Sequence, residues 1–386
     1  MRSNCFVNVL STHGVSHVEV EDPSHFPCAS PRDGMTVYWF NDRPIGHRLK
    51  ATLGGQVIEK TAFDHSSRPI LSPLHGQLSE PSASVVICSR DRPDELARCL
   101  DSFKKQTFSP RQIIVVDNGS RDDRTRAAAE GAGVIYVRED RPGLDIARNS
   151  GVRVAISDII AFTDDDLVLH PRWLEQLILA FDAPEIMAVT GLVLPAELST
   201  EAQLHFETFW SFGKGYVRKD FDKALFATYR DKAFPAWEVG AGASMAFRRE
   251  IFETIGFFDE RLDVGQAGCS GDSEFWYRML AHGHTCRYEP SAVAFHYHRK
   301  TEDGLSSQIF HYMRGHAAAL LVQHERTAIR QNLRRAFWDV PTWYLKRILH
   351  RLLRVPMPSD RFLKQEVLGY VSGLRFYWCH RKRTNV

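Results

Sequence analysis

Three consecutive aspartates, Asp164, Asp165 and Asp166, directly follow the apolar run "IIAF" at residues 159–162. Adjacent carboxylates raise one another's pKa unless a positive charge lies among them. A divalent cation such as Mg²⁺ or Mn²⁺ would supply that charge, because it takes one or two protein carboxylates together with phosphate oxygens and water. Helix capping is the alternative, but Asp166 lies too far before the next helix, which starts at Pro171, to cap it well. The spacing therefore favours a metal–phosphate site.

A fourth acid, Asp117, ends another apolar run, "QIIVVD" at residues 112–117. An acid at the tip of a strand can accept hydrogen bonds from a nucleotide, although Asp is also common in turns. The first apolar run leads into "CSRDRP" at residues 88–93 rather than into a G-x-G-x-x-G loop, and the chain has no G-x-x-x-x-G-K-[ST] sequence. These observations argue against a dinucleotide oxidoreductase and a P-loop enzyme.

The elements that position these acids follow from the hydrophobic pattern. From residue 84 onward, short apolar runs alternate with segments of helical periodicity, which predicts right-handed βαβ units and a mostly parallel sheet flanked by helices. Ligands of such sheets bind beyond the carboxyl ends of the strands, so Asp117 and the three aspartates should share one rim. We expect strands at residues 84–88, 112–117, 133–137 and 158–163, with helices at 92–106, 122–130, 144–156 and 171–181.

The 386-residue chain divides into three parts by pattern. Residues 1–80 predict a small β-rich extension with a turn at "DRPIGH" (42–47), ending in a Ser- and Pro-rich linker. Residues 81–300 carry the alternating pattern. Residues 301–386 predict helices, and from residue 326 onward they hold fourteen Lys or Arg against three acids.

The C-terminal region suggests where the protein works. Residues 343–353, "WYLKRILHRLL", predict a basic amphipathic helix, which could lie on anionic lipid or pack on the rest of the chain. No run of about 18 apolar residues predicts a membrane-spanning helix, and the N-terminus lacks the pattern of a signal peptide. The seven cysteines are odd in number and have no C-x-x-C spacing, which favours a reducing compartment. We expect a cytoplasmic protein, with peripheral contact to the inner face of the membrane as a further hypothesis, and no nucleic-acid partner.

Four segments occur in order along the chain: "SVVICSRDRPDELARCLDSFKKQ", "IIVVDNGS", "RPGLDIARNSGV" and "IIAFTDDDLVLHPRWL". Together they resemble family 2 glycosyltransferases, which are inverting enzymes of the GT-A fold that use nucleotide sugars. The resemblance covers about residues 84–300. It implies a GT-A-like α/β fold, here with a small N-terminal β extension and a helical C-terminal region. It also implies a nucleotide-sugar donor (UDP, GDP or dTDP), a glycan or lipid-linked acceptor, Mn²⁺ or Mg²⁺, and a role in polysaccharide or glycolipid assembly.

The resemblance implies roles for the residues that match its motifs. The three aspartates match the D-x-D element, in which Asp164 and Asp166 would hold the metal. A late-strand histidine is the third ligand in similar enzymes, and "AFHYHR" offers His296 or His298, of which we choose His296. The residues expected to bind the donor nucleotide are Cys88, Arg90, Asp117, Arg148, Asp164 and Asp165.

The resemblance places the catalytic base in "SGDSEF" at residues 270–275. Asp272 matches the Asp of a motif that usually reads Glu-Asp, and it would remove the proton of the acceptor hydroxyl. Gly271 stands where the Glu is usual, and this departure keeps other interpretations open. Glu274 is the second candidate for the base. A sugar-phosphate nucleotidyltransferase and a non-catalytic glycan- or nucleotide-binding module remain the alternatives, although the first would normally show a Gly-rich loop after strand one.

Overall fold

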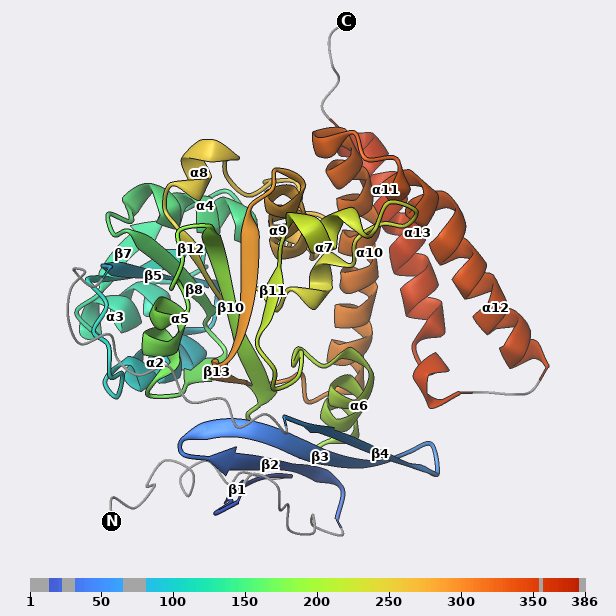
Figure 1. Ribbon diagram of the computed structural model, residues 1–386, viewed down its shortest axis with the longest axis horizontal. Coiled ribbons are helices and arrows are strands. Elements are labelled where there is room, and N and C mark those ends of the chain that lie inside the picture. The colour runs from blue at the N-terminus through green and yellow to red at the C-terminus, as the bar shows by residue number, and fades with distance from the viewer. Residues whose placement is uncertain (1–13, 23–31, 65–80, 354–356, 382–386) are drawn as a thin grey trace, which may run out of the picture.

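The computed structural model describes residues 14–22, 32–64, 81–353 and 357–381. A large mixed sheet with helices on both faces forms the centre, a small sheet lies below it, and long helices stand to one side (Figure 1). The predicted α/β class, N-terminal β extension and helical C-terminal region are therefore confirmed. The predicted linker at 66–84 falls mostly outside the described residues, and so does the boundary expected at residue 80.

The central sheet has the strand order β11-β13-β10-β12-β8-β5-β6-β7, with β9 paired to β13. Strands β5, β6, β7, β8, β10 and β13 run in one direction, whereas β9, β11 and β12 run in the other. The sheet is thus mostly parallel, as predicted. Its strands are β5 (Ala83–Ser89), β6 (Gln112–Asp117), β7 (Ile135–Arg138), β8 (Ile159–Asp164), β9 (Leu167–Leu169), β10 (Ile186–Pro195), β11 (Lys219–Phe221), β12 (Ser244–Arg248) and β13 (Thr285–His296).

Both faces of this sheet are covered, which explains the unbroken apolar runs of its strands. Val85 and Ile87 pack into one core, while Val86 between them packs into the other. The first core includes α2 (Pro93–Phe103), α3 (Arg124–Gly131) and α5 (Trp173–Leu179). The second includes α4 (Leu144–Val154) and α9 (Gly271–Ala281). Further short helices are α6 (Glu201–Trp210), α7 (Lys223–Ala227), α8 (Ile251–Thr254) and the 3₁₀ turn Ala236–Glu238.

The N-terminal sheet has the order β1 (Val15–Glu19), β2 (Gly34–Phe40), β3 (Arg43–Leu53) and β4 (Gln56–Phe63). It meets the central sheet through Trp39, whose ring stacks on that of His170 with centroids 5.4 Å apart. The turn expected at residues 42–47 was predicted too late. Asn41 and Asp42 both have positive φ and form a two-residue hairpin turn, so β3 already begins at Arg43.

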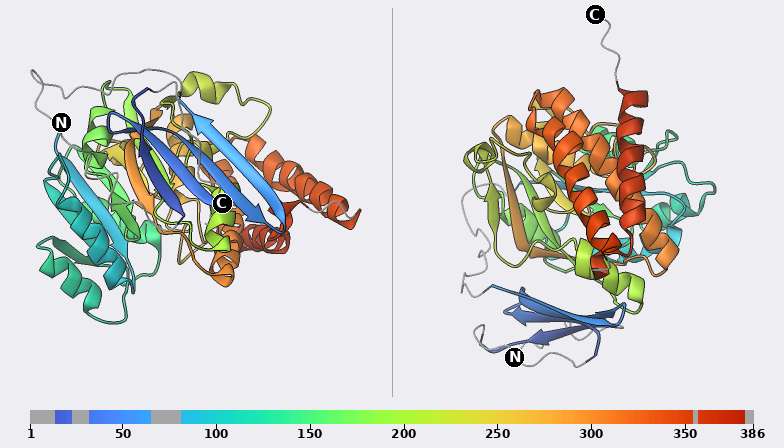
Figure 2. Two further views of the ribbon diagram at one scale, coloured as in Figure 1. Left: turned by 90° about the horizontal axis from the view of Figure 1, so that it is seen from below. Right: turned by 90° about the vertical axis from the view of Figure 1, so that its right-hand side faces the viewer.

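The C-terminal helices are α10 (Glu302–Thr327), α11 (Gln331–Arg334), a π-helical segment (Arg335–Asp339), α12 (Val340–Leu352), a 3₁₀ turn (Pro358–Asp360) and α13 (Leu363–His380). Helices α10 and α13 run side by side (Figure 2). Their close approach needs glycine, because a Cβ atom on Gly373 would lie 2.1 Å from the carbonyl oxygen of Arg314. Within the described ranges, no helix is long and apolar enough to cross a membrane.

Candidate active site

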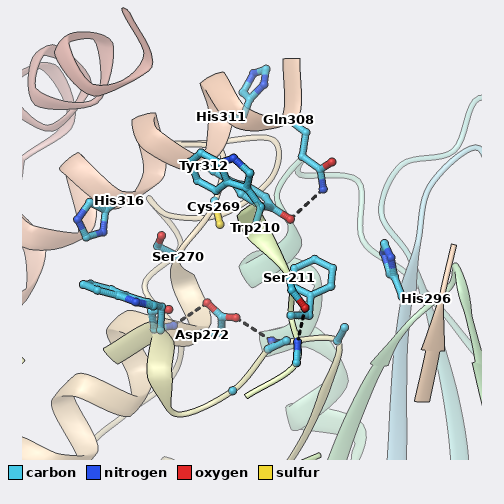
Figure 3. Close-up of a pocket in the computed structure, with 18 of the residues that line it drawn as sticks. Trp210, Ser211, Cys269, Ser270, Asp272, His296, Gln308, His311, Tyr312 and His316 are labelled. Atoms are coloured by element: carbon cyan, nitrogen blue, oxygen red, sulfur yellow. Dashed lines mark hydrogen bonds between the residues drawn. The ribbon is translucent and has the colours of Figure 1, made fainter. Parts of the chain in front are cut away.

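A cleft of about 1980 Å³ opens where the parallel strands end. All three parts of the chain line it, with Lys60 from the N-terminal sheet, Asp164 and Asp272 from the central domain, and Arg335 from the C-terminal helices. Its volume exceeds the roughly 300–1,000 Å³ that is usual for one small ligand. There is therefore room for a donor and an acceptor together. Asp272 lies on one side of the cleft and His296 on the other (Figure 3).

The aspartate cluster has a positive partner that the sequence did not reveal. Nη1 of Arg92, at the start of α2, lies 3.1 Å from Oδ1 of Asp165 and 3.1 Å from Oδ2 of Asp166. The other oxygen of Asp165 accepts a hydrogen bond of 2.8 Å from Ser89 Oγ. Burial raises the pKa of Asp165 to about 7, and the neighbouring Asp166 adds to the shift. Part of the repulsion among the three carboxylates is thus relieved by the protein itself.

His296 joins this cluster from the end of β13. Its Nε2 lies 3.3 Å from Oδ1 of Asp166. Although burial opposes the shift, His296 and Arg92 hold the pKa of Asp166 below its usual range. His298 lies behind His296, with 2.8 Å between their Nδ1 atoms, and its Nε2 is 3.0 Å from buried Glu207. Of the two histidines, only His296 lines the cleft.

The residues present suit a divalent cation, because two potential donors, Asp166 and His296, are already adjacent. Oδ1 of Asp166 is buried without a hydrogen-bond donor and faces the imidazole of His296. Asp164 also lines the cleft, and its side chain is 34% exposed. Among the described His, Cys, Asp and Glu side chains, no group of three is arranged as a complete metal site. Such an incomplete protein set is what Mg²⁺ and Mn²⁺ use when phosphate oxygens and water fill the other positions.

Arg148 on α4 forms the centre of a buried charge network. Its Nη1 lies 3.0 Å from Oδ1 of Asp145 and 2.8 Å from Oδ2 of Asp263, and its Nη2 lies 3.9 Å from Oδ1 of Asp164. The sequence interpretation missed both Asp145 and Asp263. The spacing of Asp145 three residues before Arg148 on a predicted helix could have indicated the first. No local signal indicates Asp263, which comes from a distant loop.

Asp272 sits in the first turn of α9 and faces the cleft. Its Oδ2 accepts a hydrogen bond of 2.8 Å from the backbone N–H of Gly242, and its Oδ1 accepts one of 2.6 Å from the N–H of Ser273. Burial raises the pKa of this carboxyl, and the like charge of Asp263 raises it further, although Arg148 opposes the shift. The carboxylate is therefore fixed in orientation and is more basic than an ordinary aspartate.

The structure gives a physical reason for the glycine before Asp272. A Cβ atom on Gly271 would lie 1.8 Å from Oδ2 of Asp145. That oxygen is buried without a hydrogen-bond donor. The carboxylate of Asp145 thus fills the space that a side chain at position 271 would need. Gly271 therefore replaces the usual Glu at a position where Asp145, on α4, supplies a carboxylate instead.

The other predicted site residues divide into two groups. Cys88 and Arg90 line the cleft. Asp117 is fully buried and accepts hydrogen bonds from Ser120, Tyr136 and Arg138, so it shapes the turn after β6. Glu274 is likewise fully buried and forms two hydrogen bonds of 3.0 Å with Arg278. Neither of these two acids is among the residues that line the cleft.

The far end of the cleft carries aromatic side chains, arginines and the acids Asp339 and Glu366. Its lining includes Trp210, Trp237 and Trp343 together with Arg314 and Arg335. The sequence alone did not assign the C-terminal helices to the site, because their pattern indicates only amphipathic helices.

Comparisons with known proteins agree with this geometry. Residues 84–256 match the model of Glycosyl transferase family 2. A glucosyl-dolichyl phosphate glucuronosyltransferase of Haloferax volcanii is 24% identical over 302 residues, which cover 75% of this chain and 84% of that protein. The O-antigen biosynthesis protein RfbC of Myxococcus xanthus is 27% identical over 217 residues, but these span 53% of this chain and only 16% of RfbC.

The fold has a solved counterpart in the mannosyltransferase PcManGT of Pyrobaculum calidifontis, a structure in complex with GDP-Man and Mn²⁺. The TM-score is 0.52 at 16% sequence identity, and the match covers 77% of this chain and 88% of that one. This likeness confirms the predicted GT-A-like architecture. The motifs and the family model agree that residues 84–256 resemble glycosyl transferase family 2, and the solved counterpart shows the same fold.

Proposed function

We propose that this chain is a metal-dependent, inverting glycosyltransferase whose catalytic unit is residues 81–300. It would move a sugar from a nucleotide-diphosphate sugar to an acceptor hydroxyl in polysaccharide or glycolipid assembly. One observation carries the proposal: the oriented carboxylate of Asp272 shares a cleft with the acidic rim of Asp164 and Asp166. The relatives support it, since they include a glucosyl-dolichyl phosphate glucuronosyltransferase and a mannosyltransferase solved with GDP-Man and Mn²⁺.

In this mechanism Asp272 takes the proton of the acceptor hydroxyl. The hydroxyl oxygen then attacks the anomeric carbon from the face opposite the leaving group, and the bond from that carbon to the diphosphate oxygen breaks, which inverts the configuration. The raised pKa of Asp272 suits a general base. The N–H groups of Gly242 and Ser273 hold the carboxylate in place while it accepts the proton.

The donor would lie along the strand ends. Cys88 and Arg90 would contact the nucleoside, with Arg148, Asp164 and Asp165 toward the diphosphate, while Asp117 supports the turn next to it. Mn²⁺ or Mg²⁺, held by Asp164, Asp166 and His296, would supply positive charge to the leaving diphosphate. Glu274 is better suited to anchor α9 through Arg278 than to act as the base, because it is fully buried.

The C-terminal helices would bring the enzyme to a membrane surface. Helix α12 buries only Val340 and Tyr344. Its exposed apolar side chains are Trp343, Leu345, Ile348, Leu349 and Leu352. Lys346 and Arg351 accompany them, which is the composition of helices that lie on anionic lipid. We expect the protein to co-sediment with phosphatidylglycerol vesicles but not with phosphatidylcholine vesicles. A protein that sediments with neither kind of vesicle would contradict this proposal.

The direct test is to incubate the protein and Mn²⁺ with UDP, GDP and dTDP sugars and to measure release of the nucleoside diphosphate. Release from one donor class supports the transferase. Release of pyrophosphate from a nucleoside triphosphate and a sugar phosphate would instead identify a nucleotidyltransferase. Donor binding without turnover, unchanged by Asp272→Asn, would identify a binding module.

A further inference from the structure

Two arginines in the far wall of the cleft have no acidic partner. Arg314 on α10 and Arg335 in the π-helical segment both line the cleft, and their Nε atoms are buried without a hydrogen-bond acceptor. Neither guanidinium forms an ion pair with a carboxylate anywhere in the described ranges 14–22, 32–64, 81–353 and 357–381. Two other cleft arginines with little exposure are paired: Arg148 contacts Asp145 and Asp263, and Arg347 contacts Asp360 and Glu366. Arg90 and Arg299 also line the cleft without an ion pair to another described residue, but both are exposed, so among the lining arginines the buried unpaired nitrogens lie on the C-terminal helices.

Arg335 is held in a fixed position by its surroundings. Its guanidinium lies over the ring of Trp237, 4.5 Å from the centroid, and Trp237 in turn meets His316 edge-on at 5.4 Å. Burial lowers the pKa of Arg335, and it lowers that of His316 to about 3, so His316 is neutral near pH 7. Asp339, whose charge acts on Arg335, is paired with Arg334 at 3.4 Å. A guanidinium stacked on an aromatic ring still offers its N–H groups to an anion.

The guanidinium of Arg335 lies in the same cleft as Asp272, the proposed base. Trp237 is followed in the chain by Glu238, and the charges of Glu238 and Asp272 both act on Lys214, another lining residue. His316 lies on the same side of the cleft as Ser270 and Asp272, opposite His296 (Figure 3). Apolar side chains connect this wall of the cleft to the protein surface. Trp343 and Met357 line the cleft, and they are also 48% and 55% exposed.

We infer that Arg335, stacked on Trp237 and assisted by Arg314, binds a phosphate group of the acceptor. The acceptor would then present its hydroxyl to Asp272, its phosphate to Arg335 and its apolar portion to Trp343 and Met357. This inference rests on the proposed glycosyl transfer and adds the chemical class of the acceptor. The exposed apolar residues beside the site favour a lipid-linked phosphate over a soluble phosphate ester.

Calorimetric titration with farnesyl phosphate, farnesol and inorganic phosphate tests the inference in the presence of Mn²⁺ and nucleoside diphosphate. Farnesyl phosphate should bind, and Arg335→Gln should weaken it at least about tenfold, as expected for the loss of a charge-assisted hydrogen bond. Arg335→Lys should restore part of the affinity. Arg330→Gln is the matched control. Arg330 is an exposed arginine in the same region, and its replacement removes the same charge. Melting temperatures report whether each variant folds.

Three outcomes would overturn the inference: farnesol binding as tightly as farnesyl phosphate, Arg335→Gln binding like the wild type, and Arg330→Gln weakening binding as much as Arg335→Gln. Inorganic phosphate that binds as tightly as farnesyl phosphate would keep the phosphate subsite but assign it to a soluble ester. Failure of the proposed function looks different, because no nucleotide sugar would then be turned over. Donor turnover without farnesyl phosphate binding would refute only the acceptor subsite.

Discussion

The two ends of the cleft differ in whether their arginines are paired with acids. At the strand ends two arginines are already paired with acids: Arg92 with Asp165 and Asp166, and Arg148 with Asp145 and Asp263. At the helical end, no carboxylate of the described residues lies within ion-pair distance of Arg335. Unpaired buried charge is costly, so the fold keeps it only where a ligand can compensate it. The matched end suits a donor that arrives with its own cation, and the unmatched end suits an anionic acceptor.

The largest effect should come from replacing Asp272, the proposed base. Asp272→Asn keeps the size of the side chain but cannot accept the acceptor proton, so transfer should fall by about 10²–10⁴-fold while the donor still binds. Initial rates of nucleoside diphosphate release measure the loss, and calorimetry measures donor binding. Asp303→Asn, an exposed acid on α10, is the control and should keep full activity. Wild-type rates in Asp272→Asn would remove this residue from the mechanism.

Metal removal should affect only the strand end. A chelator should lower transfer by about a hundredfold or more, because the leaving diphosphate loses its neutralising charge. Added Mn²⁺ should restore it. Mn²⁺ binding followed by electron paramagnetic resonance should weaken in Asp166→Asn and stay unchanged in Arg335→Gln. Full activity in the chelator, or Mn²⁺ binding that does not depend on Asp166, would show that these residues do not form a metal site.

The strand end could be predicted from sequence because its information is local. Each parallel strand is an apolar run with a polar residue at its carboxyl end, so the rim at Asp117 and Asp164 follows from the chain order alone. The direction of the side chains could not be predicted. Asp117 turns inward to Arg138 and Tyr136, since its buried oxygens need donors.

The helical end was not predictable, because its partners are far apart in the chain. Trp237 and Arg335 are separated by almost a hundred residues, and only the packing of the π-helical segment brings them together. Gly271 was not explained by the sequence for the same reason: it stands where the motif usually has Glu, and its partner is distant in the chain. Its meaning depends on Asp145, which a different helix supplies.

The contact between Gly271 and Asp145 offers a sharper test of the matched end. Gly271→Ala puts a methyl group 1.8 Å from Oδ2 of Asp145, and the required shift should lower the free energy of unfolding by about 1–3 kcal/mol. In an Asp145→Ala background the same change should cost much less, because the opposing oxygen is gone. Urea denaturation of the four proteins gives the coupling energy. Additive effects would mean that the two residues do not compete for space.

The smallest effect concerns the pH profile of the base, and it ties the matched network to catalysis. A general base works only when it is deprotonated. The value of kcat/KM should therefore decrease as the pH is lowered past the pKa of Asp272. Burial and Asp263 raise that pKa, which puts the acid limb above the roughly 3.9 of an ordinary aspartate. Asp263→Asn removes the like charge and should move the limb to lower pH, whereas Asp303→Asn should leave it in place. An acid limb that stays fixed in Asp263→Asn would mean that this charge does not tune the base. A shift to lower pH would show that the charge of Asp263, within the network around Arg148, sets how readily Asp272 accepts a proton.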